Sequence, residues 1–144
     1  MSVGLIMESL RTFMAPRDTR IQMSGTPVRI GIDTADALSL ALHELATNAL
    51  KFGAFSRSDA RLDVSWQLEP RTPLPHLVIS WIESGVPLTP GPPRRHGFGM
   101  ELLEKSLKYE LEAEVAIDLT STGLRLRLSL PHVQTAEGDP AAAR

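Results

Sequence analysis

The sequence contains no cysteine and no long uninterrupted hydrophobic run. The first absence excludes disulfides and thiolate metal sites, and it favours a reducing compartment such as the cytoplasm. The second argues against a membrane-spanning helix, which needs roughly 20 consecutive apolar residues. A signal peptide is not expected either, because Glu8 and Arg11 interrupt the N-terminal apolar pattern. These absences predict a cytoplasmic protein that makes no direct membrane contact.

The chain also lacks a strong charge of either sign, with a net charge of −2 at pH 7. Nothing in this balance indicates a nucleic-acid partner, which usually requires a basic surface. What is present is an ordinary globular composition, with 42% hydrophobic and 22% charged residues. A length of 144 residues is sufficient for one domain with a proper core. The expected organisation is a single cytosolic domain, or a piece of a larger cytosolic protein.

Apolar residues at helical spacing predict three helices. The first ends at Pro16, and its apolar positions are Val3, Ile6, Leu10 and Phe13. The second begins at a cap formed by Asp33 or Thr34. It runs to Phe52 and ends at Gly53. The third has an apolar face made of Met100, Leu103, Leu107 and Leu111.

Six short strands are expected between and after these helices. Residues 62–69 alternate between apolar and polar side chains, which is typical of a strand with one buried face. The other expected strands are Arg20–Ser24, Val28–Ile32, His76–Glu83, Val115–Leu119 and Leu124–Leu130. Residues 133–144 are expected to form a disordered tail after a domain of residues 1–132. This order of elements predicts helices on one face of a mixed, mainly antiparallel sheet, which is a two-layer α/β sandwich.

Polar residues follow one line along the second expected helix, in the stretch HELATNALKFGA at residues 43–54. Glu44, Asn48 and Lys51 share a narrow arc, because spacings of four and three return to the same helix face. The arc borders the apolar face, which is formed by Leu38, Leu42, Leu45 and Ala49. Carboxylate and amide oxygens suit Mg²⁺, and an ammonium suits phosphate. The same spacings occur on solvated helices, so an ordinary surface helix stays open as the alternative.

Two downstream segments also carry residues that suit a ligand. In WIESGVP, the carboxylate of Glu83 ends a strand and is followed by a turn that contains Gly85. In RRHGFGMELLE, Gly97 and Gly99 immediately precede a helix, where backbone N–H groups can approach a phosphate. The neighbouring residues Arg94, Arg95 and His96 add positive charge. A solvated surface loop remains the alternative interpretation of this last segment.

The motifs HELATNALKFGA, WIESG and GFGMELLEKSLKYEL, in this order, resemble the ATP-binding catalytic domain of bacterial sensor histidine kinases. These domains belong to the gyrase, Hsp90, histidine kinase and MutL superfamily. The narrower resemblance is to the HWE family, whose hallmark residues are here His43, Trp81 and Glu83. The similarity covers about residues 5–131 and implies the Bergerat-type ATP-binding sandwich. It implies ATP or ADP together with Mg²⁺ as ligands.

The resemblance also implies a role for each matching residue. Asn48 would coordinate the Mg²⁺ that bridges the phosphates, Glu44 would orient or polarise the attacking group, and Lys51 would face the phosphates. His43 is grouped with Glu44 and Lys51 as a catalytic residue. Glu83 would accept a hydrogen bond from the adenine amino group. The remaining expected nucleotide-binding positions are Gly85, Arg95, His96, Gly97 and Gly99, which border or belong to a short lid.

Two departures from the family pattern matter. Val86 and Pro87 stand where related domains often have a further glycine, which would make the turn beneath the base stiffer. None of the four histidines, His43, His76, His96 and His132, matches the phosphoacceptor of the family. The expected partners are therefore a separate dimerisation and phosphoacceptor domain, and a response regulator receiver domain downstream.

Some alternatives stay open at this point. Trp66 is expected in the core, whereas Trp81 could pack under the nucleotide or simply close the core. A non-catalytic nucleotide-binding regulatory module is one alternative to a histidine kinase domain. A serine kinase of the anti-sigma-factor type, from the same superfamily, is another.

Overall fold

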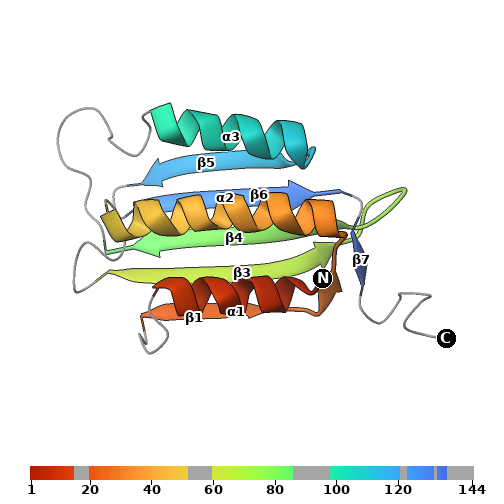
Figure 1. The fold of residues 1–144 in the computed structure, drawn as a ribbon, viewed down its shortest axis with the longest axis horizontal. Helices are drawn as coiled ribbons and strands as arrows, with labels where there is room; N and C mark the ends of the chain where they lie inside the picture. Colours follow the sequence, from red (N-terminus) through yellow and green to blue (C-terminus); the bar gives the residue numbers. More distant parts are fainter. Residues whose placement is uncertain (15–19, 52–59, 86–97, 121–122, 132, 136–144) are drawn as a thin grey trace.

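The structure is a computed structural model that describes all residues except 15–19, 52–59, 86–97, 121–122, 132 and 136–144. Within the described part, one layer of helices lies over a five-stranded sheet (Figure 1). The helices are α1 (Val3–Met14), α2 (Ile32–Lys51) and α3 (Phe98–Glu110). The predicted two-layer α/β sandwich is therefore confirmed.

The main sheet is mixed, with the strand order β1-β3-β4-β6-β5. Its strands are β1 (Ile21–Gly25), β3 (Arg61–Glu69), β4 (His76–Ser84), β5 (Glu114–Thr120) and β6 (Gly123–Leu130). β1 runs parallel to β3, and the other neighbours are antiparallel. A second, two-stranded sheet pairs β2 (Val28–Arg29) with β7 (Gln134–Thr135). The predicted alternation of β3 is confirmed up to Gln67, and the last two residues, Leu68 and Glu69, are both partly buried.

The hydrophobic core lies between the helices and the sheet. α2 occupies the middle of the helix layer, with α1 on one side and α3 on the other (Figure 1). Its predicted apolar face is fully buried, at Leu38, Leu42, Leu45 and Ala49. Burying a leucine side chain contributes roughly 1.5–3 kcal/mol relative to leaving it exposed. This face is therefore a main reason that α2 packs against the sheet. Separately, each described helix is too short or too polar to cross a lipid bilayer.

The two expected N-terminal strands form, but they do not pair with each other. β1 pairs with β3, and β2 pairs with β7. Ile32 was predicted to end the second strand, whereas it begins α2. The carbonyl of Gly31 accepts the amide of Ala35 at 2.8 Å, so the helix starts before Asp33 and Thr34. Local signals cannot specify strand partners that lie tens of residues away.

Two further predictions need correction, one on the apolar face of α1 and one on the C-terminal tail. Phe13 was assigned to the apolar face of α1 but is 51% exposed, and Met14 is buried in its place. The first residues of the predicted tail are ordered, because Val133 is buried and Gln134–Thr135 pair with β2. The rest of the predicted tail, residues 136–144, lies outside the described residues. Short polar segments such as β7 gain order from a distant partner strand, which composition does not reveal.

Candidate functional site

Three motifs that are distant in the sequence meet at one end of the sandwich (the left end in Figure 1). α2 and β4 both run toward this end, and α3 begins there (Figure 1). Asn48 lies in the last turn of α2, and Glu83 is the penultimate residue of β4. Gly99 is the second residue of α3. The topology thus gathers the end of a helix, the end of a strand and the beginning of a helix.

Glu83 is the one charged side chain that is buried among the described residues, with 1% exposure. It lies on the helix-covered side of β4, together with Trp81, because residues two apart in a strand share a face. The Trp81 Nε1–H group donates a hydrogen bond to Glu83 Oε2 at 2.8 Å. A buried carboxylate is tolerated when it is hydrogen-bonded, and the indole supplies such a bond. Trp81 is fully buried, so it closes the core and does not present its ring for stacking.

Two glycines determine the backbone around Glu83. Gly85 has a φ of 77°, in the left-handed region that favours glycine. Gly123, the first residue of β6, has a φ of 151° and approaches the Glu83 carbonyl so closely that a Cβ atom would overlap its oxygen. Gly85 was expected from the family pattern. Gly123 was not recognised from the sequence, because a glycine in a hairpin turn has ordinary steric reasons to be there.

The polar residues of α2 have different degrees of exposure. Asn48 is half-buried and Glu44, one turn earlier, is exposed, so both border the apolar face as predicted. The prediction that Gly99 precedes α3 is wrong by two residues, because the helix begins at Phe98. The Lys51 side chain lies outside the described part, as do Arg95, His96 and Gly97.

His43 lies on the side of α2 that faces α1. Its ring centroid is 5.0 Å from that of Phe13, and its Nδ1 atom is 2.8 Å from the carbonyl oxygen of Ser39. This contact with α1 favours a packing role. The catalytic role of His43 stays a prediction without support from these contacts.

No preformed metal cluster is found among the described side chains, where no group of three or more His, Asp or Glu residues converges. Mg²⁺ in nucleotide sites is usually held by one or two protein oxygens together with substrate phosphates. The amide oxygen of Asn48 at the end of α2 suits this arrangement. The residues present therefore fit a Mg²⁺ that arrives with a nucleotide, rather than a resident metal centre.

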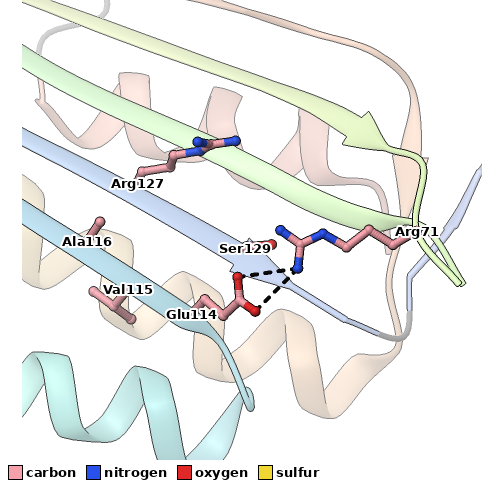
Figure 2. A pocket seen from close by; sticks show the side chains of 6 residues that line it. All are labelled: Arg71, Glu114, Val115, Ala116, Arg127 and Ser129. Atoms are coloured by element: carbon pink, nitrogen blue, oxygen red, sulfur yellow. Dashed lines mark hydrogen bonds and ion pairs between the residues drawn. The ribbon is translucent and has the colours of Figure 1, made fainter.

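A hollow on a different part of the molecule lies where β5 begins and β6 ends (Figure 2). It is lined by Arg71, Glu114, Val115, Ala116, Arg127 and Ser129. Arg71 donates to both carboxylate oxygens of Glu114, at 3.2 and 3.3 Å, and to Glu69 at 3.1 Å. These hydrogen bonds, first to Glu114 and then to Glu69, raise the pKa of Arg71. The guanidinium is already matched by carboxylates, so this hollow is a weaker candidate for an anionic ligand.

Sequence comparison finds relatives among bacterial kinases. Blue-light-activated histidine kinases of Brucella ovis and Brucella melitensis are 34% identical to the chain over 130 residues, and that of Brucella anthropi is 35% identical. The match covers 88% of this chain and 26% of each relative. The chain thus spans about a quarter of the length of the curated relatives it matches. No family profile matches it.

Solved structures with the same fold are also kinases. The Erythrobacter litoralis EL346 blue-light activated histidine kinase has a TM-score of 0.63 at 18% identity, over 90% of this chain and 40% of the other. The catalytic domain of histidine kinase ThkA, in a nucleotide-free form, has a TM-score of 0.62 at 12% identity, over 91% of this chain and 94% of the other. At such low identity these likenesses concern the fold alone, and they agree with the observed sandwich.

Proposed function

We propose that the chain is a histidine kinase catalytic domain that binds ATP with Mg²⁺ and phosphorylates a histidine on a separate dimerisation domain, which its relatives and its fold support. The observation that carries this proposal is the buried Glu83, at the end of the sandwich where α2 ends and α3 begins. A carboxylate can accept several hydrogen bonds, so a ligand with a matching donor suits this position.

Base recognition is assigned to Glu83 and Gly85. An ionised carboxylate only accepts hydrogen bonds, so it suits the exocyclic amine of adenine. Guanine presents a carbonyl oxygen at that position, which would place two acceptors against each other. Gly85, with its φ of 77°, turns the chain two residues after Glu83 and would add no side chain beside the base.

Phosphate binding is assigned to the ends of the two helices. Asn48 would hold Mg²⁺, which neutralises charge on the phosphates, and Lys51 would face them. The beginning of α3 favours an anion through its free N–H groups and its dipole, and Gly99 lies in that first turn. The other proposed contributors come from the adjoining segment, namely Arg95, His96 and Gly97.

The proposed reaction is an in-line phosphoryl transfer. A nitrogen of the acceptor imidazole forms a bond to the γ-phosphorus while the bond to the β–γ bridging oxygen breaks, and ADP leaves. The protein contributes mainly positioning and charge neutralisation to such a step. Glu44 is exposed, so it is accessible to an attacking group supplied by another domain, which it would orient.

The partners follow from this reaction. The match covers only 26% of each relative, which is consistent with a phosphoacceptor domain in the same or another polypeptide. A receiver domain of a response regulator would take the phosphoryl group in the next step. Location in the cytoplasm remains a prediction from the sequence.

Titration calorimetry and a transfer assay with labelled ATP test the proposal together. We expect Mg²⁺-dependent ATP binding, no stable phosphate on this chain alone, and acid-labile phosphate on an added dimerisation domain of a related kinase. Asn48→Ala should lose the Mg²⁺-dependent part of the affinity. Gln67→Ala, which removes an exposed carboxamide from β3, should not.

Other outcomes of this experiment would support the two alternatives. ATP binding without any transfer would favour a regulatory module that holds nucleotide structurally. Acid-stable phosphate on a serine of a partner protein would favour the serine kinase. The absence of ATP binding would contradict the proposal outright.

A further inference from the structure

We propose that Trp81 is a positioning residue for base recognition, whose indole N–H holds the Glu83 carboxylate in the orientation that accepts the adenine amine. This inference rests on the proposed function, and it assigns part of the specificity of that site to a residue that does not touch the nucleotide. The observation behind it is the hydrogen bond from Trp81 Nε1 to Glu83 Oε2 at 2.8 Å, between two buried side chains.

The donor in this bond is held rigidly. Trp81 is fully buried in the centre of the sheet, and it pairs with Val64 of β3 on one side and Leu126 of β6 on the other. Both of these neighbours are also buried. Packing on all sides fixes the ring, so the N–H group has one direction. Glu83 by itself has several rotatable bonds, and the bond to a fixed donor restricts them.

The hydrogen-bonding capacity of the two groups is suitable for this role. An indole N–H is a donor only, and an ionised carboxylate has about four acceptor sites. Glu83 can therefore accept from Trp81 and from an adenine amine at the same time. Binding groups that are oriented before the ligand arrives lose less conformational entropy on binding. Removing the indole N–H should thus reduce ATP affinity through Glu83.

The chain contains a matched control for this effect. Trp66 lies on β3, on the same helix-covered side of the sheet, and is 9% exposed. Its Nε1–H group donates to the carbonyl oxygen of Thr26 at 2.9 Å. Trp66→Phe and Trp81→Phe therefore each remove one indole hydrogen bond from a similar place. Only the second change affects Glu83.

Calorimetric titration of ATP and GTP against five proteins tests the inference. The proteins are the parent, Trp81→Phe, Trp66→Phe, Glu83→Ala and the double variant Trp81→Phe with Glu83→Ala. We expect Trp81→Phe to weaken ATP binding about tenfold, the order of one hydrogen bond to a charged group, and to leave GTP binding nearly unchanged. Trp66→Phe should keep the parental affinities. In the double variant, ATP should bind no more weakly than in Glu83→Ala, because the two residues act through one contact.

A second measurement applies even if Trp81→Phe does not fold. The indole N–H resonance of Trp81 in the parent, read by nuclear magnetic resonance and assigned against Trp66→Phe, should shift when ATP is added. The Trp66 resonance in the parent should stay in place.

Each result has a distinct meaning. A folded Trp81→Phe variant with parental ATP affinity and preference overturns the inference, as do additive losses in the double variant or an unmoved Trp81 resonance in ATP-saturated parent. In these cases the parent still binds ATP, so the proposed function survives. A parent that does not bind ATP overturns both.

Discussion

The two sides of the main sheet differ in the charged side chains that they carry. On the side covered by helices, β3, β4 and β6 present apolar side chains, and Glu83 is the one buried charged residue in the described part of the chain. On the open side, Glu69, Arg71, Glu114 and Arg127 form a network of ion pairs at 3.0 to 3.2 Å. These side chains are all partly exposed.

This difference indicates which charges need a functional explanation. Exposed ion pairs gain little, because water and salt screen them and their long side chains lose entropy. They persist on the open side at little cost and carry little information about function. A carboxylate among buried apolar groups is expensive unless it is paired, and the Trp81 indole supplies one partner. Glu83 is therefore the charge that we assign to the proposed ligand site.

The largest expected effect on stability comes from comparing substitutions on the two sides of the sheet at neighbouring residues of one strand. Ile79 and Ser80 are consecutive residues of β4, and Ile79 is fully buried under the helices while Ser80 faces the open side. Ile79→Ala should lower the free energy of unfolding by about 2–5 kcal/mol, because it leaves a cavity in the core. Ser80→Ala should change it by less than about 0.5 kcal/mol. Urea denaturation of both variants measures the contrast, and similar losses would mean that the open side is also packed.

The next effect concerns the close approach of β6 to the Glu83 backbone. Gly123→Ala should cost about 1–3 kcal/mol, because of its φ of 151° and the overlap with the Glu83 carbonyl. It should also weaken ATP binding, since the backbone of Glu83 must shift. Gly4→Ala is the control, because the nearest atom to its Cβ would be 3.5 Å away. The control should be neutral or should stabilise α1 by up to roughly 1 kcal/mol. Thermal unfolding and calorimetry measure the two effects. A Gly123→Ala variant with the stability and ATP affinity of the parent would contradict this prediction.

A smaller effect compares one buried carboxylate with one on the open side. The parent should prefer ATP over GTP by at least roughly tenfold, which corresponds to ~1.4 kcal/mol. Glu83→Ala should weaken ATP binding and reduce that preference, with little change for GTP. Glu69→Ala removes a half-exposed carboxylate of the open side and should leave both affinities unchanged. Equal affinities in the parent, or an unchanged preference in Glu83→Ala, would show that Glu83 does not recognise the base.

The smallest effect is expected from the ion pairs of the open side. Arg71→Ala should lower the Tm slightly at low ionic strength, and the difference should disappear in high salt. Because its carboxylate partners raise the pKa of Arg71, the contribution of the guanidinium is present at neutral pH and is lost as the pH rises into the strongly alkaline range. Arg125→Ala, also on the open side, is the control. A large loss of Tm that persists in high salt would mean that this network is structural.

The candidate site was predictable from the sequence to the extent that it lies on regular elements. The arc of Glu44 and Asn48 beside the apolar face of α2 follows from helical periodicity alone. The bond between Trp81 and Glu83 was also accessible in principle, because residues two apart in a strand share a face. The sequence did not reveal the role of Gly123 or the position of His43 against Phe13, since both depend on contacts with distant segments.

The sequence alone determined the existence of three helices, the buried faces of α2 and β3, the two-layer class and the histidine kinase resemblance. Each of these depends on residue order within a short window or on motif order along the chain. Only the tertiary structure decided that β1 runs parallel to β3, that β2 pairs with β7, and that His43 packs against Phe13 of α1. Strand pairing and helix contacts join residues far apart in the chain. Their choice depends on the total burial and hydrogen bonding of the folded domain, which no single segment specifies.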